Sequence, residues 1–245
     1  MRILVLFLVC LLNLPALAQS AADLATTAAV RQQMTRMHGD SLNSLFIAER
    51  LENHSDDGNN NTVWEAQGWV GYDRDKLWLK SEGESDAGES ELQALYSRAI
   101  SPFWDLQLGL RHDFGTEQNR DYAVIGLMGL APYWFELDAA AFISDEGDVS
   151  ARLEAEYELR FTQRLILQPR MELNYAFSED LVNGIGKGMS KAHLGLRLRY
   201  EFKREIAPYI GLAWEKSFGK TANLIRATGM DNEELVFVAG LRVWY

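Results

Sequence analysis

The sequence contains few of the residues on which several common protein classes depend. Its 245 residues include one cysteine, Cys10, and 5 prolines, and its 19 glycines are spread along the chain. One cysteine cannot build a disulfide scaffold, and this content of proline and glycine excludes collagen-like and low-complexity sequences. Basic residues are in deficit, because 24 Lys and Arg face 35 Asp and Glu and give a formal net charge of -11. That charge argues against a general nucleic-acid binder, which needs a basic surface.

Long hydrophobic runs are also missing beyond the first residues. The most apolar later stretch, residues 127–142, is interrupted by Pro132, Glu136 and Asp138. A transmembrane helix needs about 20 predominantly apolar residues, so the sequence predicts no such helix.

The first 18 residues are typical of a secretory signal peptide. Arg2 precedes an apolar run, and residues 16–18 read Ala-Leu-Ala, which fits an A-x-A cleavage site. Cys10 lies within that run and follows Val9, which does not suit a lipoprotein signal. We therefore predict a signal peptide over 1–18 and a mature, exported chain without cysteine.

Strict alternation of apolar and polar residues dominates the rest of the chain. Residues 149–160 read VSARLEAEYELR, with one apolar and one strongly polar face and no exception. Residues 165–175 and 192–201 repeat the pattern. A period of two predicts β-strands, whereas a helix would scatter the charges around its circumference.

Twelve strands can be placed in this way. The predicted ranges are 44–53, 62–72, 76–84, 91–100, 103–113, 120–131, 133–144, 148–161, 164–175, 190–202, 206–217 and 235–245. An even number of strands, with short turns alternating with longer connections such as 54–61, 176–189 and 218–234, is typical of bacterial outer-membrane barrels. We predict an all-β fold, an antiparallel up-and-down transmembrane β-barrel over 44–245, preceded by a flexible periplasmic segment over 19–43.

Aromatic residues gather where the two membrane interfaces are expected. Phe103-Trp104 and Tyr133-Trp134 open predicted strands, and the chain ends on Tyr245 within the alternating strand LVFVAGLRVWY. Rings at strand ends suit interfacial girdles, and a terminal aromatic resembles the insertion signal of outer-membrane proteins. The alternative is the core of a soluble β-sandwich.

Three residues fit the predicted lipid face badly. Arg98 lies near a turn and His112 near a loop, where a polar side chain can reach the interface. Glu49 has no such explanation and indicates that the first strand is misregistered by one residue.

The predicted inner face is crowded with charges of both signs. They are Glu65, Lys80, Glu82, Asp105, Arg111, Asp113, Glu136, Asp138, Arg152, Glu154, Glu156, Arg170, Glu172, Arg197, Arg199, Glu201 and Arg242. One hypothesis is a network of ion pairs that fills the interior, and the other is a conduit whose acidic residues favour cations. Interleaving of the two signs favours the filled or narrowly gated interior.

Several long phrases resemble one family of outer-membrane proteins. Residues Tyr96–Asp113, Gly129–Ala139 and the closing strand are similar to the copper resistance protein B family, and Trp64–Glu84 resembles its entry region. The resemblance covers roughly 44–245. It implies location in the cell outer membrane, a role in copper resistance and homeostasis, and a periplasmic multicopper oxidase as a partner.

Family members typically carry a Met- and His-rich segment before the barrel. Here residues 19–43 hold Met34, Met37 and His38, which one helical turn could bring together as soft and borderline ligands for copper. His193 and carboxylates in the lumen are further candidate donors. The copper oxidation state stays open, and the alternative is a flexible tail with incidental methionines.

Enzymatic signatures are missing from the sequence. None of the four histidines (His38, His54, His112 and His193) can be placed beside a luminal serine, and no zinc spacing or phosphate-binding loop occurs. The acidic fragment 54–61 is more typical of a solvated loop than of a Ca²⁺ site. We therefore predict no enzyme, and the alternatives to copper handling are a general channel for small polar solutes and a structural barrel.

Overall fold

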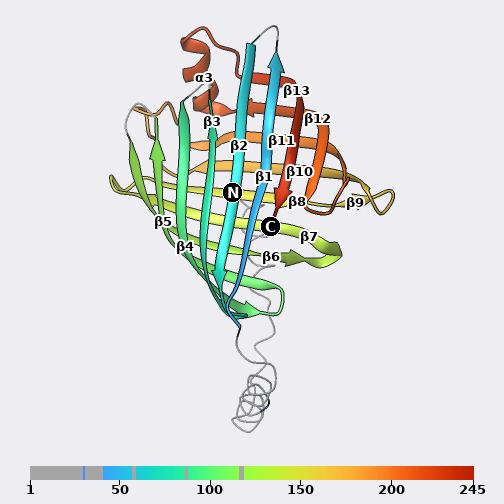
Figure 1. Ribbon diagram of the computed structural model, residues 1–245. Coiled ribbons are helices and arrows are strands. Elements are labelled where there is room, and N and C mark those ends of the chain that lie inside the picture. Colours follow the sequence, from blue (N-terminus) through green and yellow to red (C-terminus); the bar gives the residue numbers. More distant parts are fainter. Residues whose placement is uncertain (1–29, 31–40, 57–58, 86–87, 116–118) are drawn as a thin grey trace. The chain divides into compact units, whose positions relative to one another are not determined.

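The computed structural model describes residues 30, 41–56, 59–85, 88–115 and 119–245 (Figure 1). The predicted signal peptide and the three candidate ligands Met34, Met37 and His38 lie outside these residues. Among the described residues, no helix has both the length and the apolar character needed to cross a membrane.

The described chain is built almost entirely from antiparallel strands. They are β1 (Asn43–Asp56), β2 (Asn59–Gly71), β3 (Asp75–Glu84), β4 (Glu89–Ser101), β5 (Trp104–Phe114), β6 (Arg120–Ala131), β7 (Phe135–Ser144), β8 (Val149–Glu156), β9 (Leu159–Arg160), β10 (Leu165–Ala176), β11 (Gly188–Tyr200), β12 (Ile206–Ser217) and β13 (Glu233–Trp244). Two short helices interrupt them, η1 (Pro132–Trp134) and α3 (Gly219–Ala227).

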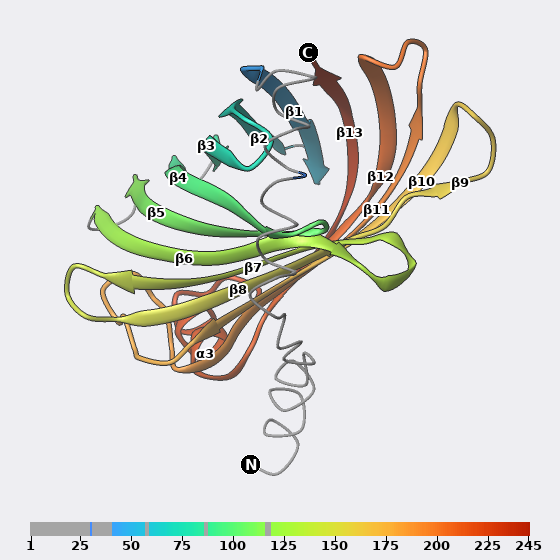
Figure 2. The ribbon, with the colours of Figure 1, turned by 90° about the horizontal axis from the view of Figure 1, so that it is seen from below.

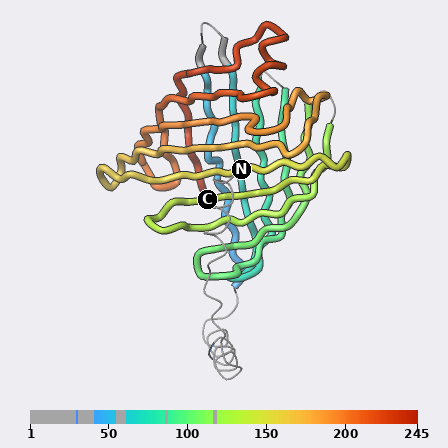
Figure 3. The backbone as a smooth tube through the Cα atoms, turned by 180° about the vertical axis from the view of Figure 1, so that it is seen from behind, coloured from blue at the N-terminus to red at the C-terminus, as the bar shows by residue number. Residues whose placement is uncertain are grey.

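The sheet closes on itself because β1 pairs with both β2 and β13 (Figure 2). At the seam, Phe46 and Tyr245 exchange backbone N–H···O hydrogen bonds of 2.9 and 2.8 Å. Strands β8 and β9 both pair with β10, so the 13 strand segments make twelve spans. The predicted twelve-stranded antiparallel barrel is confirmed. Viewed from behind, strands of the near and far walls cross steeply, as the tilt of barrel strands requires (Figure 3).

The predicted strand 148–161 is one span with a break. Pairing with β10 stops after Glu156 and resumes at Leu159, and Pro169 of β10 lies opposite the gap. The Pro169 carbonyl accepts from the Tyr157 amide at 3.1 Å, but proline has no N–H to return a hydrogen bond. The missing donor accounts for the break between β8 and β9.

Glu49 was placed wrongly on the lipid face. Ala48 pairs with Ala66 and Arg50 with Glu65, so β1 holds one residue more than β2 at this point. This β-bulge re-aims the Glu49 carboxylate inward, where it accepts hydrogen bonds from side chains of β2 and β13. The register of β1 against β2 therefore shifts by one residue at the bulge, so the predicted misregistration applies to one side of it and not to the whole strand.

The predicted connections differ from the structure at two places. Residues 54–61 were expected to form a loop, but β1 continues to Asp56 and β2 begins at Asn59. The predicted strand 133–144 begins instead at Phe135, because Tyr133 and Trp134 adopt left-handed backbone angles within η1. The longest connections among the described residues are 177–187 and 218–232. They lie at the end of the barrel opposite to Asn43, where β1 begins, and to Trp244, where β13 ends.

The two faces of the wall have opposite character. Outward side chains such as Leu110, Ile210 and Phe237 are exposed. Aromatic side chains pair near strand ends, with ring centroids 4.8 Å apart for Tyr175 and Phe177 and 5.0 Å for Tyr200 and Phe202. An apolar outer band flanked by aromatic residues is the surface of an outer-membrane barrel, and the short turns mark its periplasmic end.

The other two residues that fit the lipid face badly lie near the ends of their strands. Arg98 is half exposed, 3.7 Å from the Asp75 carboxylate beside the β2–β3 turn. His112 lies 2.6 Å from the Asp121 carboxylate at the extracellular end of β5 and β6. Both polar side chains therefore have polar partners near an interface.

Candidate functional site

Two arginines cross the barrel interior, and we refer to Arg152 and Arg170 as the arginine clamp. Arg152 on β8 donates to Glu82 on β3 at 2.8 Å and to Glu91 on β4 at 2.9 Å. Arg170 on β10 reaches Glu65 on β2 at 2.5 Å. Each bond joins walls that are far apart in strand order, so side chains span the lumen at this level.

Further ion pairs extend the clamp along the wall. Arg111 on β5 contacts Glu91 at 2.7 Å, and Arg50 on β1 contacts Glu65 at 2.7 Å. Arg170 also donates to Glu154 on β8 at 2.7 Å. These contacts are the kind that the filled-interior hypothesis predicts, with charges of both signs neutralising one another.

The clamp is largely shielded from water. The side chains of Arg152 and Arg170 are 12% and 6% exposed. A charge in such surroundings is tolerated when it is paired, and removing its partner costs about 3–5 kcal/mol. Mutual pairing therefore fixes these side chains across the lumen.

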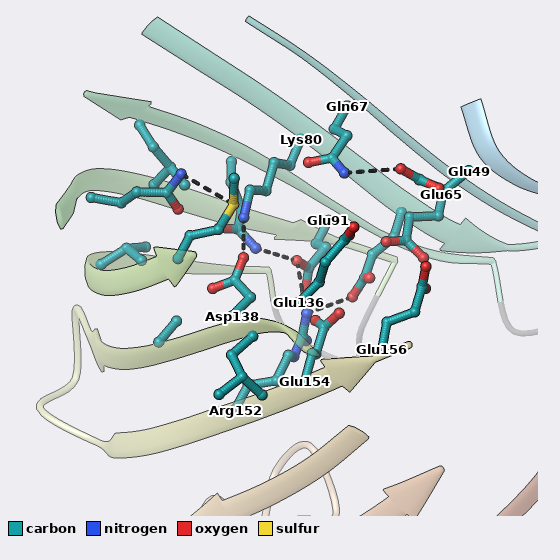
Figure 4. A pocket seen from close by; sticks show the side chains of 18 of the residues that line it. Glu49, Glu65, Gln67, Lys80, Glu91, Glu136, Asp138, Arg152, Glu154 and Glu156 are labelled. Atoms are coloured by element: carbon teal, nitrogen blue, oxygen red, sulfur yellow. Dashed lines mark hydrogen bonds and ion pairs between the residues drawn. The ribbon is translucent and has the colours of Figure 1, made fainter. Parts of the chain in front are cut away.

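A cavity of about 340 Å³ lies between the clamp and the periplasmic end of β6 and β7 (Figure 4). Eight acidic side chains line it: Glu49, Glu65, Glu82, Glu91, Glu136, Asp138, Glu154 and Glu156. Three basic side chains line it: Lys80, Arg152 and Arg170. Arg50, Arg111 and Arg242 pair with three of these carboxylates from outside the lining, so eight negative formal charges face six positive ones. The remaining excess of two negative charges raises the local concentration of cations.

The acidic residues of this cavity differ in how they are compensated. Asp138 is held by Lys80 at 2.5 Å, and Glu49 by Arg242 at 2.9 Å. Glu156 accepts from the neutral amide of Gln168. Within the described residues, Glu136 has neither a hydrogen-bond nor an ion-pair partner. The uncompensated negative charge therefore gathers at the periplasmic end of the cavity.

One wall of the cavity is apolar. Leu95, Val124 and Phe142 line it and belong to the buried cluster on the inner face of β3–β7. Met128 lies on the same wall, and its sulfur accepts from the Gln107 amide at 3.7 Å. Met128 thus places a thioether in the lumen. It was not named as a candidate ligand from the sequence, because β6 has few polar residues that would mark its inward face.

The predicted ligand His193 lies on β11 and faces the lumen. Its Nδ1 is buried and has no hydrogen-bond partner among the described residues, and the charges of Arg50, Arg170 and Glu172 act on it. No group of three or more His, Cys, Asp or Glu side chains among the described residues is arranged to hold a metal ion. The structure therefore does not bring His193 together with a set of carboxylates.

At the extracellular end, loops are joined by a buried guanidinium. Arg120 at the start of β6 contacts Glu146 at 2.5 Å and Asp180 at 3.4 Å. The Asp180 loop is linked in turn to α3, because the Gly186 amide donates to the Thr221 hydroxyl at 2.9 Å. These contacts tie the connections 145–148, 177–187 and 218–232 to one another.

Comparison with known proteins gives consistent results for sequence and fold. A family model described as "Copper resistance protein B precursor" matches residues 42–245. The chain is 42% identical over 212 residues to copper resistance protein B of Escherichia coli, covering 85% of this chain and 72% of that protein. It is 42% identical over 213 residues to a copper resistance protein B homolog of Pseudomonas syringae pv. tomato, covering 86% and 72%.

Among solved structures, the NanC porin has a similar fold. The TM-score is 0.52 at 14% sequence identity, and the match covers 83% of this chain and 99% of the porin chain. At this level of identity the likeness concerns the barrel architecture alone.

Proposed function

The chain belongs to the copper resistance protein B family, and we propose that this outer-membrane barrel lowers the copper load of the periplasm by binding copper or moving it across the outer membrane. The observation that carries the proposal, beside family membership, is the acidic cavity on the periplasmic side of the clamp. Copper ions are the cargo in this proposal, and both oxidation states carry the positive charge that such a cavity attracts.

Copper capture begins, in this proposal, on the segment before β1. Met34 and Met37 supply thioethers and His38 an imidazole, which suits the soft Cu(I) ion. The segment is joined to β1 at Asn43, at the end of the barrel that carries the short turns. Bringing three ligand side chains together around one ion costs conformational entropy, so the affinity should be modest.

The second step is transfer to the cavity. Its excess negative charge gives the ion a favourable place after release, with Glu136 and Glu156 as oxygen donors and Met128 as a soft donor lining the same cavity. His193 is the nitrogen donor that we propose next along the lumen, because its Nδ1 is free of hydrogen bonds within the described residues. The arginines around His193 oppose a cation there, which makes it secondary to the tail and the cavity.

The clamp sets the limit on passage through the barrel. We propose that it closes the lumen to general solutes, because its ion pairs span the interior from β8 and β10 to β2, β3 and β4. This argument disfavours a general diffusion channel. Family membership and the porin-like fold support a non-catalytic protein. A periplasmic multicopper oxidase is the protein partner that we propose from the family resemblance.

Titration of the folded full-length protein with Cu(I) against a competing chelator tests the copper sites. A variant with Met34→Ala, Met37→Ala and His38→Ala should lose most of the high-affinity binding. A second variant, Glu136→Gln with Glu156→Gln, should keep this high-affinity binding and lose the weaker binding in the cavity. The matched control is Glu205→Gln with Asp73→Asn, which removes two exposed carboxylates of periplasmic turns outside the cavity.

Two results would count against these assignments. Unchanged Cu(I) affinity in the triple variant, together with unchanged copper tolerance of cells, would eliminate the tail as the copper site. Equal losses in the cavity variant and in its control would show that general surface charge, and not the cavity, holds the weakly bound ions.

A further inference from the structure

Basic side chains gather at two neighbouring periplasmic turns of this acidic protein. The turn after β9 and the turn after β11 line an open recess of about 670 Å³. Arg160, Arg164, Lys203 and Arg204 line it, and Glu201 is the one acidic residue in its wall. Four positive and one negative formal charge give an excess of three positive charges, in a chain whose net charge is -11.

Hydrogen bonds hold the two turns in place. The Thr162 hydroxyl accepts from the backbone amides of Arg164 and Leu165 at 3.2 and 2.9 Å, which fixes the first turn. The Arg164 carbonyl accepts from the Glu201 amide at 2.8 Å and so joins the first turn to the second. The Trp244 indole N–H donates to the Arg204 carbonyl at 2.6 Å and fixes the second turn against β13. The recess is therefore a built feature and not a gap between mobile loops.

Most of the positive charge in the recess is uncompensated. Arg160 donates to Glu158 at 2.7 Å, and the acid Glu201 is directed to the buried Arg199 at 3.6 Å. Across the described part of the chain, neither Arg164 nor Lys203 has a carboxylate partner. The same holds for the Arg204 side chain among the described residues, although its carbonyl is engaged. Three exposed cations are thus available to an anion.

The position of the recess indicates where that anion comes from. Phe161 and Phe202, which flank the two turns, are 64% and 67% exposed. Tyr200, whose ring meets Phe202 edge to face, is on the lipid face near the end of β11. Exposed aromatic residues at the end of a barrel strand lie at the membrane interface, at the level of lipid headgroups. The cations next to them therefore face the headgroups of the periplasmic leaflet.

We propose that this recess binds the phosphate group of an anionic phospholipid of the periplasmic leaflet. Arginine presents paired N–H donors that match phosphate oxygens, and lysine adds a mobile point charge. Acyl chains of the same lipid would pack along Phe161 and Phe202. The inference is independent of copper binding, because the recess shares no residue with the acidic cavity.

Native mass spectrometry of the folded full-length protein tests the proposal. The protein is equilibrated in micelles with equal amounts of phosphatidylglycerol and phosphatidylcholine. The lipid molecules that stay bound when the protein is released from the micelle are then identified and counted. The test variant is Arg164→Gln with Lys203→Gln and Arg204→Gln. The matched control is Arg74→Gln with Lys187→Gln and Arg226→Gln, which removes three exposed cations from other loops. Heat-modifiable gel migration confirms that each variant is folded.

The wild type and the control should retain phosphatidylglycerol in preference to phosphatidylcholine, and the test variant should lose about tenfold or more of that preference. A folded test variant with unchanged preference would overturn the site, and so would a wild type without preference. Complete displacement of phosphatidylglycerol by inorganic phosphate would overturn the assignment to a lipid, because it would show that the phosphate group alone is recognised.

Discussion

Replacing Leu196 with arginine should destabilise the barrel because it places a charge in the lipid. Leu196 lies near the middle of β11, is 45% exposed on the outer face, and pairs with Pro169 and Leu212. An arginine facing lipid near the bilayer midplane costs about 2–4 kcal/mol of folding free energy. The next residue, Arg197, is an arginine already, but it faces inward and pairs with Glu52.

Two inward substitutions provide the matched comparison. Glu154→Gln leaves Arg170 with Glu65 at 2.5 Å, so the expected loss is below about 1 kcal/mol. Arg197→Gln removes the arginine partner of Glu52, whose side chain is fully buried. Glu52 keeps its contact with the His54 ring at 2.9 Å but loses its arginine, and breaking a buried ion pair costs about 3–5 kcal/mol. Inward charges are therefore not equally dispensable.

Urea unfolding of the proteins in phospholipid vesicles, followed by tryptophan fluorescence, measures these free energies. The expected order of loss is small for Glu154→Gln and large for both Leu196→Arg and Arg197→Gln. Leu153→Arg repeats the lipid-face test on β8. Equal losses for Leu196→Arg and Glu154→Gln would refute the assignment of inner and outer faces.

Three further predictions address closure, the lumen and the extracellular loops. Deleting Tyr245 removes two backbone hydrogen bonds to β1, so assembly into the membrane should fall, and assembly at the wild-type level would contradict the role of the seam. Replacing both arginines of the arginine clamp with alanine should raise the steady conductance of the folded barrel in planar bilayers, and unchanged conductance would mean that the clamp does not close the lumen. Burial raises the pKa of Asp180, but hydrogen bonds from Asn183 and the charge of Arg120 outweigh it and hold the pKa below its usual value. Because the folded pKa is depressed, this contribution to stability is present at neutral pH and is lost as the pH falls below about 4. Hydrogen exchange of residues 177–187 should therefore increase in Asp180→Asn at neutral pH, and equal exchange in the wild type and the variant would contradict the contact.

The alternation of the sequence was sufficient to predict the barrel and its twelve spans. Leu153 and Leu196 lie on the outer face and Arg152 and Arg197 on the inner face, as period two requires. Side chains of adjacent residues point to opposite faces whatever the long-range contacts are, so this information is local. The role of the terminal Tyr245 was likewise predicted from the last strand of the sequence alone.

The details that depend on a partner strand could not be read in this way. The bulge at Glu49 arises from a mismatch of one residue between β1 and β2, and the break after Glu156 from a proline on β10. The arginine clamp could be predicted only if it were known which strands face each other across the barrel. Arg170 and Glu65 are 105 residues apart in the sequence. The inward charges were identifiable, but their pairing was not.

The periplasmic copper content of living cells tests the central claim most directly. Cells lacking the gene are complemented with the wild type, with Glu136→Gln plus Glu156→Gln, or with Glu205→Gln plus Asp73→Asn, and grown in excess copper. Metal analysis of the periplasmic fraction should show less copper with the wild type and the control pair than with the cavity variant or an empty vector. Equal periplasmic copper in wild-type and empty-vector cells would contradict a role in lowering the copper load, and equal copper in cavity-variant and wild-type cells would contradict the cavity as the route.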